Sequence, residues 1–171
     1  MQPVRLLRPT VVATVAVLAA AGVFEASATP GRPSAGVRVE IYASRGDPGP
    51  NCTRVFPLSR TVQAPAVLTG AMRALLRGPT AAERGRGYGG WFSRKTAGML
   101  RSVRITKGVA YVDLRNFSRV IPNASSACGS ALLLAQLDRT AKQFPNVRRP
   151  VYSFNGSARP FYEWLQRSPP G

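Results

Sequence analysis

Histidine is absent from this sequence of 171 residues, and cysteine occurs only twice, as Cys52 and Cys128. The missing imidazole excludes Ser-His-Asp and Cys-His catalytic groups and any metal site built on histidine. A disulfide between the two cysteines would also leave too few thiolates for a zinc site. We therefore expect neither a metal ion nor another cofactor in this protein.

Acidic side chains are also scarce, with 7 of them against 24 basic ones. Two carboxylates are enough for glycoside hydrolysis, so a hydrolase of cell-wall glycan stays open as an alternative function. Beyond residue 28 the acids are Glu40, Asp47, Glu83, Asp113, Asp138 and Glu163. Because arginine is in such excess, we expect each acid to pair with an arginine on its own face of the fold.

The formal net charge is +17, and nearly all of the basic residues are arginines. This charge predicts attraction to polyanions, which include anionic wall polymers, lipid head groups and nucleic acid. An arginine-rich composition also arises without any binding role. A continuous stripe of arginines would favour a nucleic-acid binder, and scattered arginines would argue against one. We do not expect nucleic acid as the partner.

Residues 1–28 have the pattern of a secretory signal peptide. Two arginines precede an apolar run from Val11 to Phe24, and Ala26-Ser27-Ala28 supplies a cleavage site before Thr29. About 14 apolar residues are fewer than the roughly 20 of a membrane-spanning helix, which favours cleavage over a retained anchor. Cleavage would leave 22 basic and 6 acidic residues, a formal charge of +16, and no membrane span.

Export would place the chain in an oxidising compartment, where an even number of cysteines indicates a disulfide. A bridge between Cys52 and Cys128 would close a loop of about 77 residues and contribute about 4 kcal/mol to stability. The alternative is a pair of separate buried thiols. Residues 29–36, rich in proline, glycine and serine, should form a flexible lead-in.

The stretch from Leu100 to Phe117 predicts a β-hairpin. Two alternating runs flank Lys107-Gly108, a short turn whose glycine adopts positive φ without steric cost. The resulting register pairs Ile105 with Ala110 and Val103 with Val112. These four residues and Leu114 share an apolar face, whereas the other face carries Ser102, Arg104, Tyr111 and Asp113.

Elements on either side of the hairpin can be assigned from periodicity and turn residues. The expected elements are a strand over residues 37–42, a short edge strand over 54–58, helices over 65–77 and 129–144, a strand over 151–154, and a helix or aromatic clasp over 160–165. The order β-α-β-β-α-β predicts an α+β fold, a two-layer sandwich with the helices on one face of a small mixed sheet around the hairpin. The domain should span 37–165, with a disordered tail over 166–171.

Several segments together resemble the GerMN domain family of sporulation, spore-germination and actinobacterial envelope proteins. They are Leu75-Leu76-Arg77-Gly78-Pro79-Thr80 with Glu83, the hairpin pattern from Val103 to Leu114, and Gln136 and Thr140 ahead of Phe144. The resemblance covers about residues 37–156. It implies an α/β sandwich and an exported, non-catalytic role in the envelope, and it implies no defined ligand.

The polar face of the hairpin is the first candidate for a binding surface. Arg38, Glu40 and Tyr42 of the first strand would extend it if that strand joins the same sheet, so the full set is Arg38, Glu40, Tyr42, Ser102, Arg104, Tyr111 and Asp113. Tyrosines among arginines offer stacking surface beside anion-pairing groups. An ordinary solvated face with local ion pairs is the alternative.

Two further groups of residues could contact a partner. Trp91, Phe92 and Trp164 form a second candidate surface, although such aromatics more often pack in a core. Gln136 and Thr140 lie one helical turn apart, and we expect them to hydrogen-bond to loop backbone rather than to a ligand. The favoured interpretation is a secreted binding or scaffold module whose partner is an envelope protein or an anionic wall polymer.

Overall fold

The computed structural model describes residues 36–46 and 51–170. The predicted signal peptide and nearly all of the lead-in lie outside these residues, as does Asp47. Residue 36, the last of the expected lead-in, already belongs to the first strand.

The first sheet is antiparallel, with strand order β2-β1-β3. It contains β1 (Gly36–Arg45), β2 (Phe56–Gln63) and β3 (Tyr88–Gly89). The alternation expected in β1 is present, because Val39, Ile41 and Ala43 are buried. Pro57 is accommodated in β2 because that strand lies at the edge of the sheet.

The second sheet is mixed, with strand order β4-β5-β6. Its strands are β4 (Leu100–Thr106), β5 (Val109–Leu114) and β6 (Arg149–Phe154). The pairs Ile105–Ala110 and Val103–Val112 confirm the register predicted for the hairpin. Its turn residues Lys107 and Gly108 both have positive φ, at 50° and 81°. The strand β6 then pairs in parallel with β5.

The described residues also contain four α-helices and two 3₁₀ turns. They are α1 (Val67–Arg77), α2 (Ala81–Gly85), α3 (Ala127–Lys142) and α4 (Ala158–Trp164), with η1 (Arg94–Thr96) and η2 (Pro122–Ser125). The apolar stripe of α1 is buried, and the helix ends at Gly78 and Pro79. Ser126 caps α3, because its side chain accepts a hydrogen bond from the Gly129 amide.

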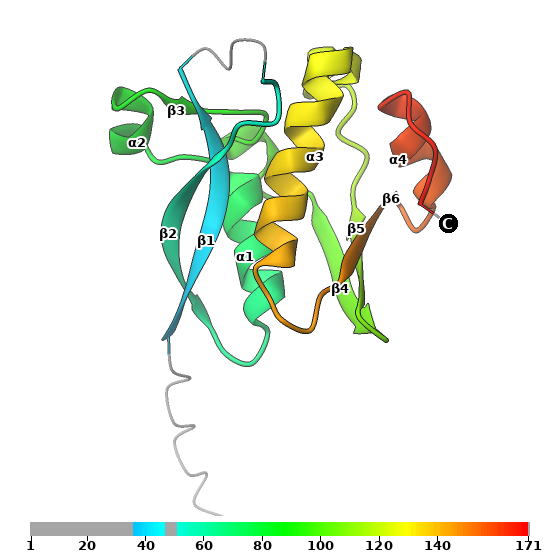
Figure 1. The fold of residues 1–171 in the computed structure, drawn as a ribbon, viewed down its shortest axis with the longest axis horizontal. Coiled ribbons are helices and arrows are strands. Elements are labelled where there is room, and N and C mark those ends of the chain that lie inside the picture. Colours follow the sequence, from blue (N-terminus) through cyan, green and yellow to red (C-terminus); the bar gives the residue numbers. More distant parts are fainter. Residues whose placement is uncertain (1–35, 47–50, 171) are drawn as a thin grey trace, which may run out of the picture. The chain divides into compact units, whose positions relative to one another are not determined.

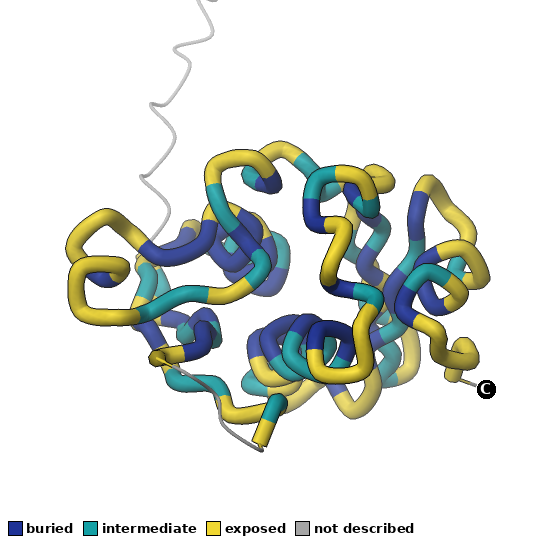
Figure 2. The backbone as a smooth tube through the Cα atoms, turned by 90° about the horizontal axis from the view of Figure 1, so that it is seen from above, coloured by how far each residue is buried: buried dark blue, intermediate teal, exposed yellow. Residues whose placement is uncertain are grey.

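The helices α1 and α3 pack side by side between the two sheets (Figure 1). α3 contacts β1 and β6, and α1 contacts β1, β2 and β4. In Figure 2 most buried segments face the interior between these elements, and most exposed segments lie at the periphery. A single cluster of buried apolar side chains therefore spans both sheets and the helices between them.

The α+β class is confirmed, but the expectation of one sheet that includes the first strand is wrong. β1 pairs with β2 and β3, and no strand joins the two sheets in the described residues. An alternating pattern shows which face of a strand is buried, whereas the identity of its neighbours depends on distant residues. Here β2, which follows β1 closely in sequence, pairs with one edge of β1. The hairpin forms a separate sheet with β6.

Candidate functional site

The polar side chains of the hairpin meet on the outer face of the second sheet, away from α1 and α3. Ser102 pairs with Asp113 and Arg104 pairs with Tyr111 across the two strands. All four line a shallow groove of about 360 Å³. The structure therefore brings together the hairpin half of the predicted binding face.

Arg104 and Tyr111 form the exposed centre of this groove. The guanidinium carbon of Arg104 lies 4.6 Å from the centre of the Tyr111 ring, which is a cation–π contact. Arg104 Nη1 also donates a hydrogen bond of 3.0 Å to Thr106 Oγ1. Among the described residues no carboxylate pairs with Arg104, so its charge is available to an anion. Tyr111 is 39% exposed and offers a flat surface beside that charge.

Asp113 instead has a structural role at the end of the groove. Its Oδ1 accepts hydrogen bonds from Ser153 Oγ at 2.8 Å and from the Gly156 amide at 2.7 Å. Its Oδ2 pairs with Arg101 Nη1 at 2.8 Å. The carboxylate thus joins β5 to β6 and to the turn after β6, and its charge is already balanced by an arginine.

Sequence reasoning missed the part of the groove that comes from the C-terminal third of the chain. Val151, Ser153, Gly156 and Ala158 complete its lining. Tyr111 pairs with Val151 and Asp113 pairs with Ser153, so alternation along β6 places these residues on the outer face. The alternation was visible in the sequence, but the parallel pairing of β6 with β5 was not.

Arg38, Glu40 and Tyr42 do not extend this face, because β1 belongs to the other sheet. Their expected junction with the hairpin residues is therefore wrong. Glu40 Oε1 accepts a hydrogen bond of 2.8 Å from Ser59 Oγ on the neighbouring strand β2. Glu40 consequently departs from the expected pairing of every acid with an arginine.

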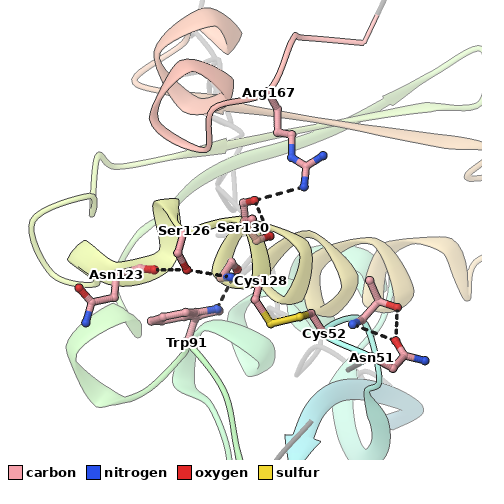
Figure 3. The surroundings of a disulfide bond; sticks show 11 residues. Asn51, Cys52, Trp91, Asn123, Ser126, Cys128, Ser130 and Arg167 are labelled. Atoms are coloured by element: carbon pink, nitrogen blue, oxygen red, sulfur yellow. Dashed lines mark hydrogen bonds between the residues drawn. A yellow bond between two sulfur atoms is a disulfide. The ribbon is translucent and has the colours of Figure 1, made fainter. Parts of the chain in front are cut away.

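The three aromatic residues of the second candidate surface pack into the fold and do not form one surface. Trp91 donates its indole N–H to the Gly129 carbonyl at 3.0 Å, at the first turn of α3 (Figure 3). Phe92 is only 3% exposed. Phe92 and Trp164 each pack against the Phe117 ring in a T-shaped arrangement, with ring centres 6.4 and 5.7 Å away. These aromatics hold the core and the helix end together rather than forming one exposed surface.

The predicted disulfide is present. Cys52 and Cys128 are bonded with their Cα atoms 5.2 Å apart, within the range that a disulfide requires. Figure 3 shows the bridge between the segment before β2 and the first turn of α3, close to Trp91. On the same helix end, Arg167 from the C-terminal tail donates a hydrogen bond to Ser130 Oγ.

Comparison with known proteins decides the family. The family described as "Germane: Sporulation and spore germination" matches residues 40–157, more than two thirds of the chain. The chain belongs to this family. The resemblance expected from the sequence is thereby confirmed, and no curated protein sequence matches the chain.

The solved structures similar to this Germane domain include two of the sporulation protein GerM from Bacillus subtilis. The tandem GerMN domains of the sporulation protein GerM from Bacillus subtilis give a TM-score of 0.46 and 19% identity, over 72% of this chain and 41% of that one. The first GerMN domain of the same protein gives a TM-score of 0.45 and 20% sequence identity, over 71% of this chain and 85% of that one. The chain thus spans about two fifths of the tandem structure.

In this Germane domain polar residues of α3 and its C-cap residue, Gln143, form hydrogen bonds with the open edge of β1. Gln143 accepts a hydrogen bond from the Glu40 amide at 2.8 Å and donates one to the Glu40 carbonyl at 2.6 Å. The Tyr42 amide donates to Thr140 Oγ1 at 3.2 Å. Side chains of a helix therefore take the place of a neighbouring strand along this part of β1.

Gln136 completes the same arrangement one turn earlier on α3. Its Nε2 donates to the Tyr42 carbonyl at 3.1 Å, and its Oε1 accepts from the Trp91 amide at 3.1 Å. The side chain is 1% exposed, so it has no surface for a ligand. Gln136 and Thr140 thus bind backbone, as expected, although the backbone is mainly that of a strand rather than of a loop.

A hydrogen bond between a tyrosine and an acid joins β6 to α3. Tyr152 donates its hydroxyl proton to Asp138 Oδ1 at 2.9 Å, and Asp138 Oδ2 pairs with Lys142 at 2.9 Å. Burial, with a smaller contribution from Asp138, raises the pKa of Tyr152 well above its ordinary value. Tyr152 therefore remains a neutral hydrogen-bond donor and is not a proton acceptor at physiological pH.

The described acids show no paired arrangement in a groove. Neither the groove beside Asp113 nor the one beside Asp138 is lined by a second carboxylate. Within the part of the chain that the structure describes, no three metal-ligating side chains gather into one group. None of the helices in the described residues combines the length and apolar character needed to cross a bilayer.

Proposed function

We propose that this Germane domain is an exported, non-catalytic binding module of the bacterial cell envelope. Its contact surface is the outer face of the β4-β5-β6 sheet. The observation that carries this proposal is the stacking of Arg104 on the exposed Tyr111 inside a groove whose carboxylate, Asp113, pairs with Arg101 and not with Arg104. A cation and an aromatic ring side by side suit an acidic sugar or an acidic protein patch.

Export is supported by two independent features. Residues 1–28 have the composition of a signal peptide, and Cys52 and Cys128 form a disulfide that an oxidising compartment would preserve. The family description, sporulation and spore germination, agrees with a role at a bacterial envelope.

The proposed partner is an anionic wall polymer or an acidic patch of an envelope protein. Basic side chains are distributed over both sheets and over α1, α2, α3 and α4. This scatter supports a general attraction to the anionic envelope and gives little support to a nucleic-acid groove. The grooves beside Asp113 and Asp138 are each lined by a single carboxylate, which likewise gives little support to glycan hydrolysis.

The proposal is tested by retention of the mature protein on purified cell wall from the producing organism. We expect Arg104→Gln combined with Tyr111→Leu to lower the affinity about tenfold at low salt. The loss should shrink as salt rises, because exposed charges are screened. The melting temperature should change little, since both side chains lie on the surface.

A matched control exists on the other sheet, where Arg45 stacks on Tyr88 at 5.2 Å. Replacing that pair by Gln and Leu removes the same charge and the same type of contact. We expect this control to be retained like the wild-type protein. Equal retention of the Arg104/Tyr111 variant and the wild type would rule out this face.

A further inference from the structure

Four arginines surround a pocket of about 450 Å³ at the C-terminal end of α1. They come from four different elements, namely Arg60 from β2, Arg77 from α1, Arg84 from α2 and Arg94 from η1. None of the lining residues is acidic, and none lines the groove on the second sheet. The pocket is therefore a separate, strongly positive site.

Only Arg60 has its charge balanced. It forms two hydrogen bonds to Glu83, of 2.7 and 2.6 Å, and these bonds lower the pKa of Glu83 to about 2. Glu83 is 8% exposed, so this carboxylate is committed to Arg60 and is not free to neutralise the pocket. Arg77, Arg84 and Arg94 have no carboxylate partner among the described residues.

The backbone beneath these arginines is held by close packing and by a buried hydrogen bond. Gly78 has a φ of 72°, and a Cβ at this position would overlap the Phe92 carbonyl oxygen, so only glycine permits the close approach of the two segments. Thr96 Oγ1 donates a hydrogen bond of 2.6 Å to the Leu76 carbonyl. These contacts fix the end of α1, which carries Arg77, against η1, which carries Arg94.

We propose that this pocket binds a phosphate group, as a phosphate ester or diester of a larger molecule. Three guanidinium groups that have no carboxylate partner among the described residues approach from different elements, and a guanidinium presents a planar fork of N–H donors that matches phosphate oxygens. One donor of Arg84 is already engaged, because its Nη1 donates a hydrogen bond to the Pro79 carbonyl. A phosphate monoester presents three terminal oxygens and a diester two, in both cases arranged tetrahedrally about phosphorus, whereas the two oxygens of a carboxylate lie in one plane. The volume leaves room for the substituents of the ester, and the site goes beyond the proposed function because it uses none of the residues of the outer face.

The test compares the wild type with Arg77→Gln combined with Arg94→Gln. Both side chains are exposed and lack carboxylate partners, so the variant should fold. The matched control is Arg119→Gln with Arg139→Gln, which removes two exposed arginines, one of them also in the last turn of a helix. The probes are inorganic phosphate, a soluble glycerol phosphate oligomer, phosphatidylglycerol vesicles, and an oligoglutamate with the charge of the oligomer.

We expect the pocket variant to lose about tenfold or more in affinity for at least one phosphate probe, measured by calorimetry or vesicle co-sedimentation at low salt. The control should stay within about twofold of the wild type. Binding of the soluble oligomer or of the vesicles alone would identify a polymer or a lipid head group as the source of the phosphate.

Three results would overturn the inference. The first is equal loss in the two variants, which would show general charge attraction. The second is pocket-dependent binding of oligoglutamate as strong as that of the glycerol phosphate oligomer, which would remove the preference for phosphate. The third is the absence of any binding of the phosphate probes by the wild type. The outer-face test does not depend on any of these outcomes.

Discussion

Glu83 is the residue whose environment changes its chemistry most clearly among the described acids. Arg60 Nη1 and Nη2 contact its two carboxylate oxygens, and the Thr80 amide donates to it at 2.7 Å. Thr80 Oγ1 in turn accepts a hydrogen bond from the Glu83 amide, which completes a capping box for α2. One side chain thus ties an edge strand to the start of a helix.

The pH dependence of stability should depend strongly on this carboxylate. The hydrogen bonds from Arg60 lower the Glu83 pKa from 4.5 to about 2 in the folded state. The stabilisation is therefore fully present above pH 4.5 and is lost as the pH falls towards 2. We expect Glu83→Gln to lower the free energy of unfolding by about 2 kcal/mol at pH 7. The difference in free energy of unfolding between the wild type and the variant should become smaller as the pH falls towards 2.

Denaturant titrations of both proteins between pH 2 and pH 7 check this expectation. Glu163→Gln is the matched control, because Glu163 pairs with Arg159 on an exposed helix face and should contribute little. A difference in free energy of unfolding between wild type and Glu83→Gln that stays constant down to pH 2 would contradict a role for the lowered pKa of Glu83. The spacing of Thr80 and Glu83 is visible in the sequence, but the contact with Arg60 depends on the tertiary placement of β2.

At the scale of elements, the hairpin was predictable because its information is local. Alternation on both sides of a two-residue turn fixes the register, and β4 and β5 follow it. β3 was missed because Tyr88-Gly89 is too short to alternate and lies in a glycine-rich segment. The sheet to which β1 belongs was predicted wrongly, because the neighbours of a strand are set by tertiary packing and not by the strand's own pattern.

The hairpin turn itself contains a residue that is poorly suited to its backbone. Lys107 has a φ of 50°, a conformation that asparagine tolerates better than lysine. We expect Lys107→Asn to raise the free energy of unfolding by about 0.5 kcal/mol, measured by urea denaturation. The turn after β6 offers the reverse test, because Asn155 has the same φ of 50° before Gly156, and Asn155→Lys should destabilise.

For the whole molecule, the disulfide is the covalent link between distant parts of one core. Cys52 precedes β2 in the first sheet, whereas Cys128 begins α3, which contacts both sheets. The sequence was sufficient to predict this bridge, because only one pairing of two cysteines exists. The outer groove was predictable only in its hairpin half, and the arginine pocket was not, because its four members are brought together by the fold alone.

Removing the bridge should destabilise the whole domain rather than one loop. We expect Cys52→Ser with Cys128→Ser to lower the free energy of unfolding by about 4 kcal/mol, because the unfolded chain regains the entropy of a long loop. Urea denaturation of the wild type with and without reductant measures the same quantity. Addition of reductant to the variant is the control and should change nothing. If the urea midpoint of the wild type stayed unchanged after its thiols were shown to be reduced, the expected stabilisation by the disulfide would be contradicted.

The helix side chains along β1 have a consequence for how that strand opens. The amides of Glu40 and Tyr42 donate to Gln143 and Thr140, so they exchange with deuterium only when α3 moves away. By alternation, the amides of Val39 and Ile41 point towards β2 and require that strand to separate. Gln143→Leu should therefore speed exchange at Glu40 and leave Val39 unchanged. Neighbouring amides of a single strand would then report two independent opening motions.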